Sequence, residues 1–518
     1  MYFKIYKSEN DVKNDRREPK SDDQKLGVRI GLVHDTWNDY GFRTAFTVFY
    51  VTKRGQPEKI GRVKIGQFGL SKEQPTPDIP SEFNSLGSDF FSLGQDVEYY
   101  SKIAAHGNDI RDEFFSSLKD MAYNQEIFKE ARDEGVTGIS LLRHVTVSSV
   151  TEQYRRIADG GEKLSDFFFE YTLPPMDNKF EQGSKIVFDV RANSSPPTNV
   201  HVVIGGNGAG KTHLLNNMAL AVVNGGSDVN KNGEFTGSHT NQSVYSIFAN
   251  IVSVSFSAFD KFKPTSVSRN KSHGPQYTYV GLKYLGKNLA PKTPSDLQRD
   301  FTESAKICVQ GARKKRWLDA LRILETDRVF QSANVSELLE AEYFDENDFK
   351  KKSAKIFGSL GAGHKIVLLT ITRLVETVNE RTLVLLDEPE AHLHPPLIAA
   401  FTRAISNLLF HRNGVAIIAT HSPIILQEVP KTCVWVISKF GDVVKFERPQ
   451  IETFGENIGI LTHEVFGLEV SNSGFHTLIK RAEEKSESYS ELINEFRGQI
   501  GGEGRGIARI LTHISGKE

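Results

Sequence analysis

The 518-residue chain contains only two cysteines, Cys308 and Cys433, and they form no CxxC motif. Two thiols are too few for a disulfide framework, which favours a reducing compartment. The formal net charge is −1, so the chain has no global basic field for nucleic acid or acidic membranes, although a local basic face is still compatible with it. Long apolar runs and a signal-peptide core are also absent from the sequence. We therefore expect a globular cytoplasmic protein without membrane contact.

One glycine-rich motif is present in full. Residues 205–212 read GGNGAGKT, a match to GxxxxGK[ST] between a strand pattern and a helix pattern. In such a Walker A loop, backbone N–H groups converge on phosphate oxygens at the positive end of a helix. The predicted nucleotide-binding residues are Gly205, Asn207, Gly208, Ala209, Gly210, Lys211 and Thr212. We expect Lys211 to reach the β- and γ-phosphates and Thr212 to bind Mg²⁺, so ATP and Mg²⁺ are the predicted cofactors.

An acidic pair follows the apolar run LVLL at 383–386. Asp387 stands where a Walker B aspartate holds the Mg²⁺ shell, and Glu388 stands where a general base polarises the attacking water. The next strand pattern ends at His421, the position of a residue that senses the γ-phosphate. We predict Glu388 and His421 as catalytic residues, and Thr212 and Asp387 as metal ligands.

A second glycine-rich stretch, FGSLGAGHK at 357–365, precedes Asp387 by one helix pattern. This order of motifs resembles the soluble branch of the ABC-type ATPases, which includes the SMC, RecF and OLD-like proteins. In that branch a signature loop at this place contacts ATP held by a second copy, which implies a head-to-tail dimer with two nucleotides at its interface. The resemblance assigns the contact to Ser359, Gly361, Gly363 and His364.

The match to this branch is imperfect at two places. The signature loop departs from the usual LSGGQ, because Gly361 replaces its serine and His364 its glutamine. No glutamine follows the strand pattern at 251–259, where Ser257 or Asp260 is the candidate substitute.

The segment EAHLHPP at 390–396 allows two interpretations. His392 and His394 can be combined with His421 into a zinc site, but such a site needs further ligands, and neither cysteine is near in sequence. The family resemblance instead places both histidines of the segment in a D-loop at the dimer interface. We retain the D-loop as the prediction.

The resemblance predicts an α/β fold: an ABC-type P-loop ATPase head with a mixed and parallel sheet, a helical insertion and an α+β N-terminal extension. The expected parts are a flexible arm (1–25), a first ATPase lobe (26–260) with a helical insertion at about 97–160, a helical lid (261–356), a second lobe (357–430) and a C-terminal α/β extension (431–518). Within the lid, the basic run RKKR at 313–316 is followed by Trp317. This pattern predicts either a nucleic-acid contact with a stacking aromatic or a solvated helix face.

The order of parts is similar to PtuA, the ATPase family of the Septu and retron anti-phage systems. The similar segments are FSAFD (256–260), EPEAHLHP (388–395) and ETFGENIGILTHEVFGL (452–468). The resemblance implies an ATP-hydrolysing subunit that controls a separate HNH-type nuclease, PtuB, and in the retron form also a reverse transcriptase with its RNA-linked DNA. No DxD, HNH or PD-ExK cluster follows His421, so we expect no intrinsic nuclease activity.

Two alternatives remain open for the ATPase. A RecF-like DNA-repair or DNA-binding ATPase is the main one, because only about 150 residues without heptads separate the Walker A loop from the signature, which excludes long coiled-coil arms. A transporter's nucleotide-binding subunit is disfavoured, because such subunits are near half this length.

Overall fold

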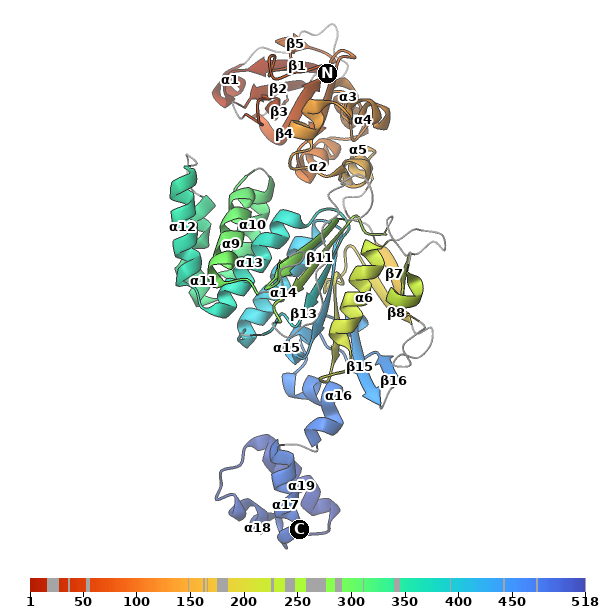
Figure 1. Cartoon of the computed structure of the whole chain (residues 1–518), viewed down its shortest axis with the longest axis vertical. Coiled ribbons are helices and arrows are strands. Elements are labelled where there is room, and N and C mark those ends of the chain that lie inside the picture. The colour runs from red at the N-terminus through yellow and green to blue at the C-terminus, as the bar shows by residue number, and fades with distance from the viewer. Residues whose placement is uncertain are drawn as a thin grey trace.

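The structure is a computed structural model of the chain. It describes residues 1–15, 28–35, 38–52, 56–147, 149–161, 164, 166–174, 185–224, 228–237, 247–257, 276–284, 291–310, 312–339, 345–391, 393–440, 443–471 and 474–517. An N-terminal α/β domain, a central α/β domain and a C-terminal group of helices follow one another along the long axis (Figure 1). Within these residues, every helix is too short or too polar to cross a membrane.

The N-terminal domain is built on a sheet in the order β5-β1-β2-β3-β4-β6. Its strands are β1 (Tyr2–Tyr6), β2 (Arg29–His34), β3 (Ala45–Val51), β4 (Glu58–Gln67), β5 (Glu82–Phe83) and β6 (Phe90–Gly94). Its helices are α1 (Glu9–Asn14), α2 (Val97–Ala105), α3 (Asn108–Ser117), α4 (Gln125–Ala131) and α5 (Arg155–Ala158), with π-helical turns at Thr137–Leu141 and Ser149–Tyr154. Aromatic side chains such as Tyr99, Phe114 and Phe115 fill a core between sheet and helices.

This domain corrects two predicted boundaries. The flexible arm expected at 1–25 is wrong for residues 1–15, because β1 pairs with β2 and the side chains of Phe3 and Val12 are buried; residues 16–27 lie outside the described part. The early strands also do not complete the ATPase lobe expected at 26–260. Together with the helices at 97–158 they enclose a hydrophobic core of their own.

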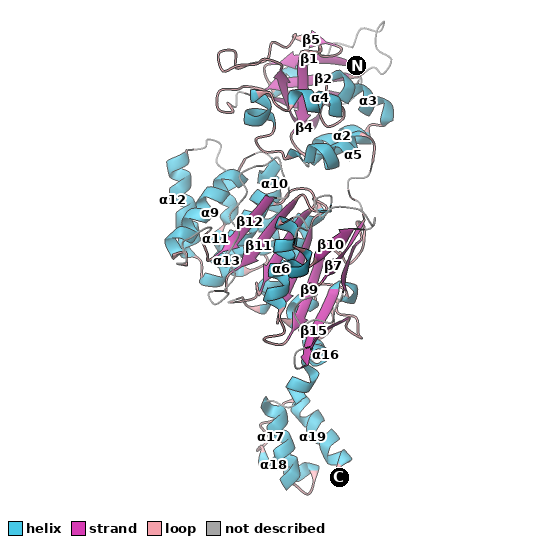
Figure 2. Cartoon of the chain, turned by 45° about the vertical axis from the view of Figure 1, so that its right-hand side comes forward, coloured by secondary structure: helices cyan, strands magenta, loops and turns pink. Residues whose placement is uncertain are grey.

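The central domain is built on a sheet in the order β12-β11-β13-β14-β9-β15-β16. Figure 2 shows strands of this sheet in magenta, with α6 in front of them. Its strands are β9 (Val200–Gly205), β11 (Asn250–Ser255), β12 (Gln276–Gly281), β13 (Thr382–Asp387), β14 (Val415–Thr420), β15 (Val434–Phe440) and β16 (Val443–Glu447). Neighbouring strands are parallel except in the β15–β16 hairpin. Strands β9, β11, β13 and β14 are buried along their length, as parallel strands covered on both faces should be. The predicted α/β class with a mixed and parallel sheet is confirmed.

Two different layers cover this sheet. On one face, α6 (Lys211–Val223) packs together with an antiparallel sheet of β7 (Phe167–Thr172), β8 (Lys185–Val190) and β10 (Glu234–Gly237), and a short helix α7 (Val229–Asn232) follows α6. The other face carries α9 (Pro294–Cys308), α10 (Ala312–Leu324), α11 (Arg328–Ala333), a 3-10 turn (Val335–Leu339), α12 (Glu346–Ser359), α13 (Ala362–Thr377) and α14 (Pro395–Phe410). The lid expected at 261–356 is thus helical from Pro294 onward, but it also contains β12 and shares one core with the sheet.

The C-terminal part has the strands and helices of the predicted α/β extension at 431–518, but its strands belong to the central sheet. After α15 (Pro423–Leu426) and a 3-10 turn (Lys431–Cys433), β15 joins the central sheet beside β9. The remainder is helical: α16 (Ile458–Ser471), α17 (Gly474–Lys485), α18 (Tyr489–Glu495) and α19 (Gly502–Ile514). The last three helices pack around a small core of Ile479, Ala482, Leu492 and Ala508.

Candidate nucleotide-binding site

Three adjacent strands bring the predicted catalytic residues together. Strand β14 lies between β9 and β13, and all three are parallel. Their carboxyl ends therefore meet at one edge of the sheet, where β9 runs into the phosphate loop, β13 ends at Asp387 and β14 leads into His421. Ligands of open parallel sheets bind at this edge. Residues separated by up to 210 positions in sequence thus share one site.

The phosphate loop needs glycine at two of its positions for backbone reasons. Gly208 and Gly210 have φ angles of 76° and 99°, which side-chain-bearing residues rarely adopt. Gly205 is required for packing, since a Cβ there would lie 2.1 Å from the carbonyl oxygen of Ile437 on β15. Asn207 and Gly208 are exposed at the tip of the loop, and Ala209 is buried beneath it. The shape of the loop is therefore fixed at its start by the packing of Gly205 against β15, and further along by the left-handed backbone conformation of Gly208 and Gly210.

Lys211, the first residue of α6, is almost fully buried. Its Nζ donates to the carbonyl oxygens of Gly205 and Gly206, both at 3.1 Å, and lies 2.7 Å from Nε2 of His421. Burial lowers the pKa of the ammonium, while the nearby carboxylates of Glu388, Asp387 and Glu390 act in the opposite direction. A buried cation at the mouth of the loop is suited to bind phosphate oxygens.

Thr212 and Asp387 form the predicted metal-ligand pair. The hydroxyl of Thr212 donates to Oδ1 of Asp387 at 3.0 Å. Hydroxyl and carboxylate oxygens are the hard ligands that Mg²⁺ prefers, so this pair fits the predicted ion.

Ser255, which the sequence analysis missed, stands beside this pair. It is the last residue of β11 and pairs in register with Asp387. Its buried Oγ has no hydrogen-bond partner among the described residues. The candidates named from sequence were Ser257, two residues further on, and Asp260, which lies outside the described residues. Only the strand register brings Ser255 next to Asp387.

Glu388 and His421 are in direct contact. Oε1 of Glu388 lies 3.0 Å from Nε2 of His421. The backbone of Glu388 has a φ of 46°, and its N–H donates to the carbonyl oxygen of Ala419 on β14 at 2.9 Å. Left-handed backbone at a non-glycine residue costs energy and clusters at functional sites. Here it directs the carboxylate toward His421.

Glu390 holds the histidine in place and was not found from sequence. Its Oε1 accepts hydrogen bonds from the hydroxyl of Thr420 and from the backbone N–H of His421, both at 2.7 Å. The acidic residue after Pro389 is visible in the sequence, but its partners lie on the neighbouring strand end. Its role follows only from the pairing of β13 with β14.

The predicted signature loop joins α12 to α13. Ser359 is exposed and donates its hydroxyl to the carbonyl oxygen of Ile356 in its own helix at 2.8 Å. Gly361 is the exposed N-cap of α13 and, like any glycine, provides no side-chain cap. Gly363 is buried inside the first turn. The structure therefore presents Ser359, Gly361 and Ala362 at the surface.

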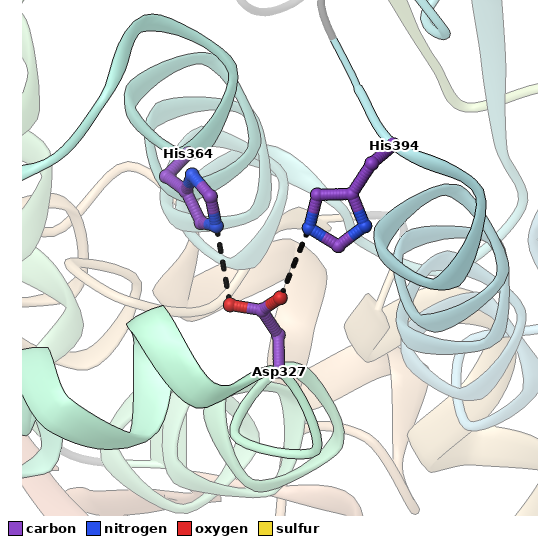
Figure 3. Close-up of side chains that lie close together, drawn as sticks. All are labelled: Asp327, His364 and His394. Atoms are coloured by element: carbon purple, nitrogen blue, oxygen red, sulfur yellow. Dashed lines mark hydrogen bonds and ion pairs between the residues drawn. The ribbon is translucent and has the colours of Figure 1, made fainter.

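His364 and His394 share one carboxylate (Figure 3). Nε2 of His364 lies 3.1 Å from Oδ1 of Asp327, and Nε2 of His394 lies 3.1 Å from Oδ2. Asp327 is also the N-cap of α11, where it accepts from two backbone N–H groups. Burial raises its pKa, but these hydrogen bonds outweigh burial and hold it below its usual value. Asp327 thus connects the signature loop to the D-loop, a link that the sequence analysis missed.

The histidines considered for a zinc site belong to two different clusters. His394 contacts Asp327, whereas His421 contacts Lys211 and Glu388. His392 lies outside the described residues. The zinc combination of His394 with His421 is therefore not assembled.

Both sequence interpretations of the basic run at 313–316 need correction. Trp317 is fully buried and donates its indole N–H to the hydroxyl of Thr372 at 3.1 Å, so it is not a stacking platform. Lys314 and Lys315 are exposed, but Arg313 and Arg316 turn toward the protein interior. The run is therefore not a simple solvated face either.

Comparison with known proteins shows which family the chain belongs to. Protein ea59 of Escherichia phage lambda is 39% identical to this chain over 513 residues, and the match covers 94% of this chain and 95% of that protein. The chain belongs to the ea59 family. Residues 314–427, which include the predicted signature, Walker B and D-loop segments, match the family described as "AAA domain, putative AbiEii toxin, Type IV TA system".

Solved structures with lower similarity include two ATP-binding cassettes. An ABC transporter cassette in its ADP conformation is 15% identical, with a TM-score of 0.31 and coverage of 59% of this chain and 99% of that one. The cbiO1 protein of Clostridium perfringens is 14% identical, with a TM-score of 0.31 and coverage of 60% and 95%. The strand order and the phosphate loop of the ea59-family chain itself are those of an α/β protein with a P-loop.

Proposed function

We propose that this protein is a Mg²⁺-dependent ATPase that dimerises around ATP and controls a separate nuclease in anti-phage defence. The observation that carries the ATPase part is a chain of contacts at the edge of the central sheet. It runs from Lys211 through His421 to Glu388, beside the pair of Thr212 and Asp387.

Each residue of this chain of contacts has a role in binding or hydrolysis. The backbone N–H groups of the phosphate loop and Lys211 hold the β- and γ-phosphates. Mg²⁺ held by Thr212 and Asp387 supplies positive charge at the phosphates. Glu388 orients the attacking water and takes its proton, and His421 senses whether the γ-phosphate is present. These assignments follow from the convergence of three strand ends.

The first turn of α13 is suited to complete the site of a second copy. The unpaired N–H groups at a helix N-terminus, with the positive end of the dipole, favour a phosphate. The N-cap residue Gly361 provides no side-chain cap for this turn, and Ser359 and Gly361 lie exposed beside it. In the proposed dimer, Ser359, Gly361, Gly363 and the N–H of His364 face the γ-phosphate held by the partner subunit.

Two comparisons support a role in defence. The relative that is 39% identical belongs to a phage, and the matched family is described as "AAA domain, putative AbiEii toxin, Type IV TA system". Among the described residues, the group of Asp327, His364 and His394 alone has metal-ligand spacing, and it lies between signature and D-loop. We therefore assign DNA cleavage to a separate HNH-type protein such as PtuB, accompanied in a retron by a reverse transcriptase with its RNA-linked DNA.

An affinity pull-down of the full chain tests this proposal. Tagged Glu388→Gln protein is expressed together with the genes that flank it in its native genome, and purified with ATP and Mg²⁺. We expect an HNH-type protein to co-purify in this state, and not with Lys211→Ala, which lacks the phosphate contact. Recovery of chromosomal DNA without a protein partner indicates the RecF-like alternative instead. Equal recovery of a partner with both variants contradicts control by ATP.

A further inference from the structure

A large cavity lies between the N-terminal domain and the central domain. It has a volume of about 660 Å³, within the range of small-molecule sites. Its described lining contains eight Lys or Arg residues and four Asp or Glu residues, together with apolar side chains such as Val97 and Leu338. The cavity therefore combines a positive field with surface suited to an uncharged ring.

Three arginines line the cavity without a neutralising partner. Arg313 and Arg316 come from α10, and Arg412 follows α14. Within the described part of the chain, none of the three forms an ion pair with a carboxylate. The buried Nε of Arg316 has no hydrogen-bond partner there either. Guanidinium groups stay charged in proteins, so burying them without an ion-pair partner destabilises the fold.

The groups that contact these arginines are neutral. Arg313 donates to Nδ1 of His144 at 3.0 Å, and burial together with the charge of Arg313 lowers the pKa of His144 to about 3. Arg316 reaches the carbonyl oxygen of Val378 at 3.4 Å. Arg412 reaches the side-chain oxygen of Gln153 at 3.4 Å. Each of these partners accepts a hydrogen bond from an arginine but does not neutralise its positive charge.

The carboxylates around the cavity are engaged elsewhere. Glu98 pairs with Lys315, Glu376 with Arg373 and Glu380 with Arg156. Asp35 pairs with Arg62. The carboxylate of Asp96 caps α2, and Asp319 lies 3.9 Å from Arg322. Glu376 attracts Arg313, and Asp96 and Glu380 attract Arg412, but only over longer distances than an ion pair. The three guanidinium groups are therefore still open to a direct contact with a ligand from outside the chain.

We propose that this cavity is a second ligand site, separate from the ATPase site, that binds a small phosphorylated molecule of nucleotide size. Arg313, Arg316 and Arg412 hold its phosphate, and the apolar lining receives its uncharged part. Guanidinium forks match phosphate oxygens in pairs, which favours phosphate over a simple halide ion. Because the lining comes from both domains, the bound ligand holds the N-terminal domain against the ATPase.

Calorimetric titration of the full-length Lys211→Ala protein tests the site without interference from the phosphate loop. The probes are AMP, inorganic pyrophosphate and, as an uncharged control, adenosine. We expect AMP and pyrophosphate to bind, adenosine to bind at least tenfold more weakly than AMP, and Arg316→Gln or Arg412→Gln to weaken AMP binding at least tenfold. Arg322→Gln removes an exposed charge from the same helix outside the cavity and should leave binding unchanged.

A second measurement keeps the test decisive if one variant folds poorly. The parent protein here is Lys211→Ala, into which Arg316→Gln is introduced. Without a probe and at low salt, the Arg316→Gln variant should unfold at a higher temperature than this parent, because an unpaired buried charge is removed. Saturating AMP should raise the unfolding temperature of the parent and not that of Arg316→Gln. Failure of both charged probes to bind overturns the proposal, as does equal binding by the parent and the two arginine variants. Binding of a 5′-phosphorylated oligonucleotide but not of AMP overturns it in favour of nucleic acid.

Discussion

Nε2 of His421 lies 2.7 Å from Nζ of Lys211 and 3.0 Å from a carboxylate oxygen of Glu388. One ring nitrogen cannot accept a hydrogen bond from an ammonium and donate one to a carboxylate at the same time. When Nε2 donates to Glu388, Lys211 keeps only the longer contact with the other ring nitrogen, Nδ1, at 3.4 Å. When Lys211 is engaged by phosphate, the ring is free to donate to Glu388, which couples occupancy of the loop to the orientation of the base.

Removing the ammonium of Lys211 should abolish nucleotide binding. Lys211→Ala loses a buried cation at the mouth of the phosphate loop, so we expect at least a 100-fold loss of ATP affinity, equal to roughly 2.8 kcal/mol at about 1.4 kcal/mol per factor of ten. Isothermal titration with ATP and Mg²⁺ measures this. Lys355→Ala, an exposed lysine on α12, serves as the control. Wild-type affinity of Lys211→Ala would place the nucleotide elsewhere.

Replacing the base should separate binding from hydrolysis. Glu388→Gln keeps the size of the side chain but cannot take a proton from water, so we expect ATP hydrolysis to slow by about 10²–10⁴-fold. The ATP-bound dimer should then accumulate, which light scattering with size-exclusion chromatography detects. Hydrolysis at the wild-type rate would show that Glu388 is not the base.

Glu390 offers a contrast between two substitutions. Its Oε1 accepts from Thr420 and from the N–H of His421, and the amide oxygen of glutamine can accept both bonds as well. We expect Glu390→Gln to keep most of the wild-type kcat, and Glu390→Ala to lower it roughly tenfold, about 1.4 kcal/mol, through a displaced His421. Steady-state kinetics with both variants measures this. If the two have the same kcat, Glu390 does not act by holding the histidine.

The structure brings the site residues predicted from sequence to one edge of the central sheet, whereas the predicted domain boundaries need correction, and both outcomes have physical reasons. Residues of the phosphate loop and of the Asp387-Glu388 pair are consecutive in the chain, so local patterns reveal them. Ser255, Asp327 and Glu390 acquire their roles only when strands and helices far apart in sequence become neighbours. The separate N-terminal domain was missed because the strand patterns at 29–67 do not reveal which sheet they join. Trp317 was misread for the same reason, since the run of four basic residues before it does not show which side of α10 faces the core.

The carboxylate of Asp327 should matter for the dimer more than for the fold. Asp327→Asn keeps an N-cap of equal quality for α11. It loses the second acceptor oxygen that faces His394. We expect unchanged ATP affinity and thermal stability, but a kcat lowered several-fold at protein concentrations where dimers form. Asp327→Ala, which also loses the cap, should in addition lose about 1 kcal/mol of stability. A stability loss in Asp327→Asn as large as in Asp327→Ala would make the role purely structural.

Acid should destabilise the central domain through His201 on β9. The ring is fully buried against Phe188, and neither nitrogen has a hydrogen-bond partner among the described residues. Burial, with a smaller contribution from the charge of Arg448, lowers the pKa of His201 to about 3, from 6.5 in the unfolded chain. Between these two values the unfolded state binds the extra proton, so stability falls as pH falls below 6.5.

The size of this effect follows from proton linkage. At pH 5 this histidine alone should lower the free energy of unfolding by about 2 kcal/mol relative to pH 7.5. Between these pH values, the free energy of unfolding of His201→Leu should therefore fall by about 2 kcal/mol less than that of the wild type. Urea unfolding at both pH values measures this difference. His463→Gln, which changes an exposed histidine on α16, should retain the wild-type difference. The pKa of His144 is also lowered by burial, so this histidine contributes a loss of stability in acid as well. Because His144 is present in all three proteins, its contribution cancels when their pH dependences are compared. An unchanged pH dependence in His201→Leu would show that the ring of His201 binds a proton as readily in the folded protein as in the unfolded chain.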